Sequence, residues 1–413
     1  MPNVLIVTND FPPRSGGIQS FVHALAATMP AGTVTVYAPA WAGAAEFDAR
    51  QPFPVIRHPG SLMLPVPSVA RRAVRILTER DCDTVLFGAA APLGLLAPAL
   101  RRAGARRTVA ITHGHEAGWA ALPGARWLLR RIGDQVDVVT YLGEYFRARL
   151  ASALSPAAAA RMVRLAPGVD TAAFRPGAGG AAIRARLGLG NRPVVLCVSR
   201  MVPRKGQDTL IRAWPRILAR AGGTAAVAGT AAARAPGASA AAGGTVAGQA
   251  AGNPGPTLDG EPVLLLVGDG PYRGDLERLA GRIGVSGSVV FTGPVPWEEL
   301  PAYYDAGDVF AMPCRTRRFG LDIEGLGIVY LEASAAGLPV VGGDSGGAPD
   351  AILDGETGFV VPGGSVGAVA DRVTSLLDDR ARAAAMGERG AAWVDKEWRW
   401  ELVAERLAKI LAG

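Results

Sequence analysis

The chain has 413 residues, 49% of them hydrophobic and 19% charged, which fits a globular protein with well-filled cores and excludes a disordered one. That length allows two domains. Its three cysteines (Cys82, Cys197 and Cys314) lie far apart without the spacing of a metal site, and such an odd set predicts a reducing compartment. The start lacks the pattern of a signal peptide, and no apolar stretch is long enough to predict a spanning helix.

The net charge of +7 is unevenly distributed. Residues 1–170 hold 18 arginines, no lysine and 11 acidic residues, so the whole excess lies in this half. A positive half indicates an anionic partner, either a phospholipid surface or a nucleic acid. Arginine that merely replaces lysine on solvated faces is the alternative. Because no nucleic-acid module or set of stacking aromatic residues is recognisable, we expect no nucleic-acid partner.

Short apolar runs alternate with helical patterns through residues 1–170, which we predict to form an N-terminal Rossmann-like lobe. This alternation is typical of a parallel sheet covered on both faces. The predicted strands lie at 4–8, 33–39, 84–90, 108–114 and 136–143, with helices that include 18–29 and 68–80.

After a linker at 171–192, rich in glycine, the same pattern restarts. We predict a second Rossmann-like lobe over 193–392. Within it, residues 222–260 are almost all small and are interpreted as a low-complexity surface insertion. The end of the chain, 393–413, includes an amphipathic helix predicted at 397–411. The strands predicted for the second lobe lie at 193–200, 262–270, 288–293, 308–314 and 338–343.

A glycine pair, Gly16 and Gly17, separates the first predicted strand from a helix. Paired glycines let the backbone approach a ligand, and the free amides of a helix start suit a phosphate. A tight turn without a ligand is the alternative. The pattern is not G-x-G-x-x-G, so a dinucleotide dehydrogenase loses its main support.

A basic loop, residues 199–206, follows the first strand of the second lobe, at the edge where open α/β sheets bind ligands. Arg200 and Lys205 in this loop can stabilise the negative charge of a departing diphosphate. A solvated basic loop is the alternative.

Two glutamates lie eight residues apart where a glycine-rich loop enters an apolar helix. We place Glu324 on the loop and Glu332 about two turns into the helix. The amides of 327–329 begin the helix and can bind phosphate oxygens. Because its neighbours are apolar, Glu332 needs a partner: either a ribose diol or a structural network.

Two of the four histidines, His113 and His115, stand at the end of a predicted strand. A histidine beside a reacting sugar can bond to its hydroxyls or stabilise a cationic transition state. A capped structural histidine is the alternative. Further ligands at zinc spacing are lacking, so we expect no protein-held metal.

Together these four motifs resemble those of family-four retaining glycosyltransferases of the GT-B fold, over nearly the whole chain except 222–260. The resemblance implies two Rossmann-like lobes with parallel sheets, a cleft between them and a last helix that crosses back to lobe one. Residues 315–319 carry bulk and charge where we expect small glycines. Six strings are similar to the actinobacterial GDP-mannose-dependent phosphatidylinositol monomannoside mannosyltransferases: NDFPPRSGGIQ (9–19), FGAAAPL (87–93), THGHEAGW (112–119), VPRKGQD (202–208), GLDIEGLGIVYLEA (320–333) and SGGAPD (345–350).

The resemblance also implies roles for individual residues. Catalytic roles fall to His113, Arg200, Lys205 and Glu324. Acceptor-binding roles in lobe one fall to Asp10, Gln19 and His115. Donor-binding roles fall to Gly16, Gly17, Arg200, Lys205, Gly268, Val295, Glu324, Gly327, Ile328, Val329 and Glu332.

The implied reaction transfers mannose from GDP-mannose to the inositol of phosphatidylinositol monomannoside through an α-1,6 link, at the inner face of the plasma membrane. No carboxylate is placed as a nucleophile, so we expect front-face attack with retention. No tightly bound cofactor is expected, and a need for a divalent metal stays open. One alternative is a related hexosyltransferase that uses another UDP- or GDP-linked sugar on a different lipid or a soluble acceptor. Another is an inactive nucleotide-sugar sensor.

Two stretches of lobe one are candidates for contact with an anionic leaflet, because each combines arginines with large apolar residues. One is 61–80 and the other is 126–131. The alternative for each is an ordinary surface helix that packs its apolar stripe on the sheet.

Overall fold

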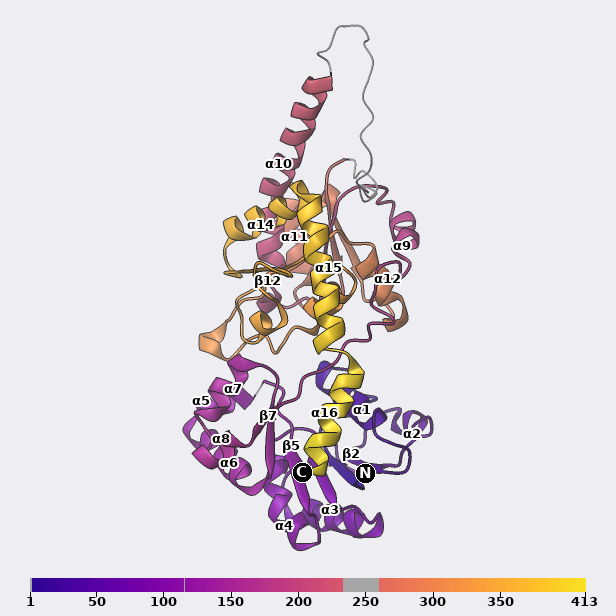
Figure 1. The fold of residues 1–413 in the computed structure, drawn as a ribbon, viewed down its shortest axis with the longest axis vertical. Helices are drawn as coiled ribbons and strands as arrows, with labels where there is room; N and C mark the ends of the chain where they lie inside the picture. Colours follow the sequence, from indigo (N-terminus) through magenta and orange to yellow (C-terminus); the bar gives the residue numbers. More distant parts are fainter. Residues whose placement is uncertain (1, 115, 233–259) are drawn as a thin grey trace, which may run out of the picture.

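The structure is a computed structural model that describes residues 2–114, 116–232 and 260–413. Two α/β lobes lie one above the other, and both ends of the chain are in the lower one (Figure 1). Each lobe is built around a parallel sheet, which confirms the predicted fold class. No helix of these described ranges is long and apolar enough to cross a membrane.

The sheet of lobe one has seven parallel strands in the order β3-β2-β1-β4-β5-β6-β7. Successive side chains of a strand face opposite sides, so along β1 Leu5 and Val7 enter one core while Val4 and Ile6 enter the other. The strands are β1 (Val4–Val7), β2 (Val34–Pro39), β3 (Val55–His58), β4 (Thr84–Phe87), β5 (Arg107–Ala110), β6 (Val138–Tyr141) and β7 (Met162–Arg164).

Several helices of lobe one begin at a proline, whose missing N–H costs nothing in a first turn. Pro67, Pro123 and Pro156 each stand there. The helices are α1 (Gly17–Ala27), α2 (Ala44–Asp48), α3 (Pro67–Glu79), the 3-10 turn η1 (Leu93–Leu96), α4 (Ala97–Arg102), α5 (Glu116–Ala121), α6 (Pro123–Gln135), α7 (Glu144–Ala151) and α8 (Pro156–Ala160).

Helix α3 packs its apolar stripe on the core. The apolar residues of this helix, which lies in the first candidate membrane stretch (61–80), are therefore not available to a membrane. Its buried side chains include Val69, Ile76 and Leu77. On α6, by contrast, Trp127 keeps 59% of its surface exposed. Arginines surround it at Arg126 and at positions 130 and 131, all exposed.

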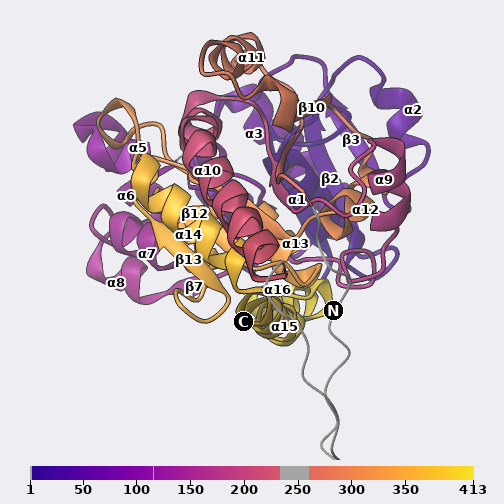
Figure 2. The same ribbon diagram turned by 90° about the horizontal axis from the view of Figure 1, so that it is seen from above.

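The sheet of lobe two has six parallel strands in the order β10-β9-β8-β11-β12-β13. They are β8 (Val194–Val198), β9 (Val263–Val267), β10 (Val289–Gly293), β11 (Val309–Met312), β12 (Val340–Gly343) and β13 (Gly358–Val361). From above, α10 and α14 lie side by side (Figure 2). The helices are α9 (Gly180–Arg186), the turn η2 (Pro203–Lys205), α10 (Gln207–Ala232), α11 (Arg273–Arg282), α12 (Leu300–Asp305), α13 (Ile328–Ala335), the turn η6 (Ala348–Ala351), α14 (Val366–Asp378), α15 (Arg380–Glu397) and α16 (Trp400–Ala412).

The stretch interpreted as a surface insertion begins inside a helix. Helix α10 continues to Ala232, so residues 222–232 are helical, which agrees with the strong helix preference of alanine. The rest of the insertion, 233–259, lies outside the described residues.

The end of the chain crosses from lobe two to lobe one, as predicted. The helix expected over 397–411 is α16, which begins later than predicted, at Trp400, because residues 398 and 399 separate it from α15, which ends at Glu397. Helix α15 runs along lobe two and α16 along lobe one (Figure 1). The amide of Val169 donates to the carbonyl of Trp398 at 2.8 Å. The two chain segments that join the lobes therefore lie beside one another.

Candidate active site

A buried ion pair stands where strand β8 ends. Lys205, on turn η2, places its Nζ 3.0 Å from Oε1 and 2.9 Å from Oε2 of Glu324. The Nε atom of Arg204 lies 3.8 Å from the same Oε2. Pairing is what makes these charges tolerable in a buried place. An ammonium has three donors, so Lys205 can bond to a phosphate oxygen as well as to the carboxylate.

Close backbone packing holds Lys205 in place. Gly206 has a φ of +78°, and a Cβ atom at this position would lie 1.9 Å from the carbonyl oxygen of Pro313. Arg315 follows on the same strand-end loop, and its Nη2 atom lies 2.9 Å from Oδ1 of Asp208, at the start of α10. The loop after β8 thus contacts the loop after β11 twice, through Gly206 and through Asp208.

Glu324 is held by the turn after β12. Its amide donates to Oγ of Ser345 at 3.2 Å, and its carbonyl accepts from the amide of Gly347 at 3.1 Å. Gly346 between them has a φ of +57° and approaches the Glu324 carbonyl so closely that a Cβ would lie 2.1 Å from its oxygen. The carboxylate is therefore fixed by backbone contacts as well as by its ion pair.

Helix α13 begins directly after this loop. Gly327 stands at its N-cap with a φ of +74° and no side-chain cap, so the amides of Ile328 and Val329 start the helix as predicted. Such amides, with the positive end of the helix dipole, suit a phosphate.

Glu332 lies little more than one turn into α13, not the expected two, because the helix begins only at Ile328. Its Oε2 accepts a hydrogen bond of 2.6 Å from the hydroxyl of Tyr304, on α12. Burial raises the pKa of Glu332 to about 7, although the bond to Tyr304 acts in the opposite direction. The structural network that competed with the ribose in the sequence interpretation therefore exists, and one carboxylate oxygen is part of it.

His113 lies where the lobes meet. Its Nε2 donates to the carbonyl of Gly88, at the end of β4, and its amide donates to Oε2 of Glu116 at 2.9 Å. A Cβ atom on Gly325 would lie 3.7 Å from the carbonyl oxygen of His113. His113 therefore lies beside the Glu324 loop. Its ring is bonded to a backbone carbonyl, as expected for the structural histidine given as the alternative in the sequence analysis. The predicted acceptor residue His115 lies outside the described residues.

The glycine pair of lobe one packs on a polar pair. Gln19 donates from Nε2 to Oδ1 of Asp10 at 2.7 Å, so two of the predicted acceptor residues bind each other. A Cβ on Gly16 would lie 2.2 Å from Oε1 of Gln19. Gly16 provides no side-chain cap for α1, which begins at Gly17, so the first amides of that helix stay available.

Three predicted donor residues lie at the same sheet edge as Lys205 but are not joined to its ion pair. The guanidinium of Arg200 is exposed, and no ion pair holds it within the described part of the chain. Gly268 packs so closely on Ser199 that a Cβ would lie 2.3 Å from its carbonyl oxygen. Val295 is half-buried after β10.

The bulky stretch 315–319 does not fill the site. Its first residue, Arg315, faces α10 through Asp208, and Arg317 lies 3.8 Å from Asp322. Phe319 is fully exposed and has a φ of 55°. The two arginines that replace expected glycines therefore pair with nearby aspartates, and the phenylalanine faces solvent.

Sequence reasoning missed three residues of this site. Arg204 was read only as part of the basic loop, although it stands directly before Lys205. Ser345 lies in the string SGGAPD (345–350), which gives no role to its hydroxyl. Tyr304 carried no signal, because its pairing with Glu332 spans 28 positions. Within the described ranges, no group of three or more His, Cys, Asp or Glu could hold a metal ion.

Comparison with known proteins agrees with this geometry. A family model described as Glycosyltransferase Family 4 matches residues 15–173, and one described as Glycosyl transferases group 1 matches residues 251–393. The GDP-mannose-dependent alpha-(1-6)-phosphatidylinositol monomannoside mannosyltransferase of Mycolicibacterium smegmatis is 51% identical over 99% of this chain and 98% of its own. This chain belongs to the family-four glycosyltransferases.

Two further comparisons place this glycosyltransferase. The GDP-mannose-dependent monoacylated alpha-(1-6)-phosphatidylinositol monomannoside mannosyltransferase of Corynebacterium glutamicum is 43% identical over 98% of this chain and 97% of its own. The structure of HepE from Anabaena, solved with UDP and glucose, superposes with a TM-score of 0.73 over 100% of both chains at 18% identity. At that identity the likeness supports the GT-B fold alone.

Proposed function

We propose that this glycosyltransferase transfers mannose from GDP-mannose to the inositol of phosphatidylinositol monomannoside, forming an α-1,6 link. The observation that carries the proposal is the 51% identity, over nearly the full length, to a relative named for that reaction. The described site is compatible with it, since cationic groups, helix amides and a buried carboxylate gather at the strand ends of lobe two.

The donor binds to lobe two in this proposal. Lys205 and the first amides of α13 face the diphosphate, where fixed donors of this kind stabilise developing negative charge. Arg200, exposed on the same loop, turns in when the donor binds. Glu332 accepts from the ribose with the oxygen that Tyr304 does not use, since a carboxylate has several acceptor positions. His113, across the lobe contact, bonds to the transferred sugar.

The reaction proceeds by front-face attack. The acceptor hydroxyl approaches the anomeric carbon from the side on which the diphosphate leaves, so configuration is retained. The departing phosphate takes the proton of that hydroxyl. Lys205 supplies most of the electrostatic stabilisation, and such a group is typically worth about 3 kcal/mol.

The acceptor reaches lobe one from the inner leaflet of the plasma membrane. Support comes from the net positive charge of residues 1–170 and from α6, where Trp127 is exposed among arginines. Leu62 and Leu64, exposed before α3, add apolar surface. Basic and aromatic side chains together are typical of a surface that lies on anionic lipid.

Transfer assays with a panel of GDP- and UDP-sugars test the donor and the acceptor. We expect mannosylated product from GDP-mannose and phosphatidylinositol monomannoside, with the α-1,6 link seen by NMR. Faster transfer from a UDP-sugar, or to a soluble acceptor, would favour the related hexosyltransferase instead. Glu46→Gln, a substitution on the exposed side of α2, is the control and should transfer mannose at the wild-type rate.

Flotation with liposomes tests the membrane contact. Binding should need anionic lipid and weaken as salt rises, because it depends on screened charges. Binding that is absent or insensitive to salt would contradict this part of the proposal.

A further inference from the structure

An apolar groove lies on the outer surface of lobe one, away from the residues of the active site. It has a volume of about 510 Å³ and lies open to solvent between α3 and α6, over η1 and α4. Helix α4 has 6 residues, whereas α3 and α6 on either side have 13 each. The short helix forms the floor of the groove and the two longer helices form its walls.

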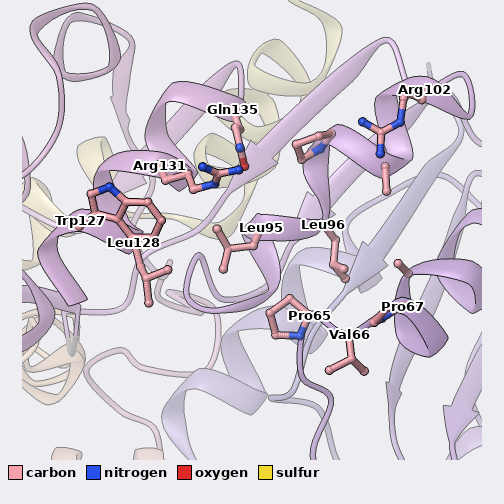
Figure 3. A pocket seen from close by; sticks show the side chains of 13 residues that line it. Pro65, Val66, Pro67, Leu95, Leu96, Arg102, Trp127, Leu128, Arg131 and Gln135 are labelled. Atoms are coloured by element: carbon pink, nitrogen blue, oxygen red, sulfur yellow. The ribbon is translucent and has the colours of Figure 1, made fainter. Parts of the chain in front are cut away.

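The lining of the groove is apolar except for two cations. Leu95 and Leu96 lie at its floor, with Val66 on one side and Trp127 on the other (Figure 3). Prolines and alanines complete most of the surface. Arg102 and Arg131 are its charged members, and Gln135 its polar one. A volume of this size with mainly apolar walls is typical of a ligand site rather than of a packing defect.

The two arginines select the occupant. Both are exposed, and neither has an acidic partner among the described residues. Arg131 lies 5.6 Å from the centroid of the Trp127 ring, so one cation is kept at the rim above an apolar wall. An apolar slot with unpaired cations at its edge is complementary to an amphiphile with a long hydrocarbon chain and an anionic head. A second copy of this chain would bring a lobe of the same positive sign against it.

The position of Arg102 separates this occupant from the acceptor. In a parallel sheet each helix runs back from the edge where the strands end, which is the edge that carries the active site. Arg102 is the last residue of α4 and stands just before β5 begins, toward the opposite edge. A phosphate at Arg102 therefore belongs to a different lipid from one whose inositol lies beside His113, at the end of β5.

We infer that the groove between α3 and α6 binds an acyl chain of an anionic membrane phospholipid that is not the acceptor, with its phosphate against Arg102 and Arg131. This inference rests on the proposed membrane contact of lobe one but not on the identity of the donor or acceptor. The bound lipid anchors lobe one at the leaflet while the cleft stays open to the acceptor.

Fluorescence quenching of Trp127 tests the groove directly. The probe is a vesicle of phosphatidylcholine and phosphatidylglycerol, the latter brominated in the middle of its acyl chains. Bromine quenches indole only at short range. Brominated vesicles should therefore quench the tryptophan emission of wild type more than that of Trp127→Phe. Ala99→Phe, which fills the groove, should remove this quenching and weaken vesicle affinity about tenfold, since hydrocarbon burial drives such binding. Ala45→Phe, exposed on α2, should change neither.

The charges are tested in the same assay. Arg102→Gln with Arg131→Gln should reduce the quenching more than Arg80→Gln with Arg106→Gln, which also removes two exposed charges of lobe one, because only the first pair lines the groove. A Tm close to that of wild type reports that lobe one is folded in each variant. Wild-type quenching in Ala99→Phe overturns the groove while leaving the membrane contact intact. Wild type that binds no anionic vesicle overturns both, and transfer to detergent-dispersed acceptor then shows whether the proposed reaction still stands.

Discussion

At the scale of single residues, Glu332 shows how burial sets a site's chemistry. Its hydrogen bond comes from a neutral hydroxyl, that of Tyr304, and both this bond and the charge of Lys205 lower its pKa less than burial raises it. Desolvation therefore dominates and raises its pKa to about 7. Near neutral pH such a group is balanced between its acid and its carboxylate, and a ligand that donates hydrogen bonds favours the carboxylate.

The first prediction concerns stability. The folded protein keeps a proton on Glu332 that the unfolded chain loses above about pH 4.5, so its contribution is full below that pH and is lost as pH rises through about 7. Glu332→Gln cannot titrate, so across this window its stability should gain on wild type by about 3 kcal/mol, at about 1.4 kcal/mol per pKa unit. The Tm difference between the two proteins over this pH range measures it. A constant difference would contradict the raised pKa.

The second prediction concerns the donor. If the ribose donates to Glu332, binding of GDP-mannose must release a proton below about pH 7, and its affinity should rise with pH up to that point. Calorimetry in buffers of different ionisation enthalpy measures the proton directly. Glu332→Gln should bind more weakly and release none. Proton release that persists in this variant would assign it to another group.

The third prediction concerns Lys205. Lys205→Ala should lower kcat/KM by a factor of about 10² to 10³, the usual loss for one fixed electrostatic donor. It also leaves the Glu324 carboxylate buried with only Arg204 near it, so stability falls as well. Lys205→Ala with Glu324→Gln should regain much of the stability without regaining activity. A double variant with near-normal turnover would remove Lys205 from the mechanism.

At the scale of elements, the strand-end loops determine the site more than the helices do. Gly206 allows the loop after β8 to contact that after β11, where any side chain would meet the Pro313 carbonyl. The loop that carries Lys205 is therefore packed directly against the end of strand β11.

The fourth prediction compares two glycines. Gly206→Ala should destabilise the protein clearly more than Gly188→Ala, which has a similar φ of +63° but no atom within 4 Å of its Cβ. The second variant reports the backbone cost alone, of order 1 kcal/mol. Thermal unfolding and the KM for the donor should both change in the first variant. Equal Tm losses would mean that the close contact with Pro313 relaxes freely.

Strands were predictable where the sequence carries an apolar run of five or more residues between helical patterns. The ten predicted strands are found, since runs such as 4–8 alternate with helices as a parallel sheet requires. The strands β3, β7 and β13 were not predicted, and all three lie at sheet edges. An edge strand needs less apolar surface, which is why β3 contains Arg57 and His58.

Only those features of the site that are local in the sequence were predictable. The Glu324 loop, the start of α13 and Lys205 stand where the motifs placed them. Contacts between distant parts of the chain were not predictable, because no local sequence pattern indicates that Lys205 pairs with Glu324 or that Gln19 bonds to Asp10. Such pairs depend on which strand ends become neighbours.

At the scale of the whole molecule, lobe one is built from both ends of the chain. Helix α16 covers the same face of its sheet as α1, and Val403, Leu407 and Ile410 are buried there. Lobe two is thus inserted between two parts of lobe one, and the two connections meet at Val169 and Trp398.

The fifth prediction follows from this arrangement. Leu407→Ala should destabilise lobe one by about 2–5 kcal/mol, the usual cost of a truncated core leucine, although position 407 is far from it in sequence. Donor binding by lobe two should persist. Limited proteolysis should then cut first within residues 1–170, and Glu405→Ala, on the exposed side of α16, should be close to wild type. Cuts that begin in lobe two would contradict the shared core.

The crossing of α16 also orders the events of synthesis. A ribosome releases residues 1–170 long before residues 400–412, so the part of the first sheet that α16 covers stays exposed while all of lobe two is being made. Lobe two, continuous in sequence, can fold during translation, whereas lobe one must wait for residues 400–412. A nascent chain of this protein therefore exposes apolar sheet surface until α16 has been made, and its yield in a cell should depend on chaperones that cover that surface.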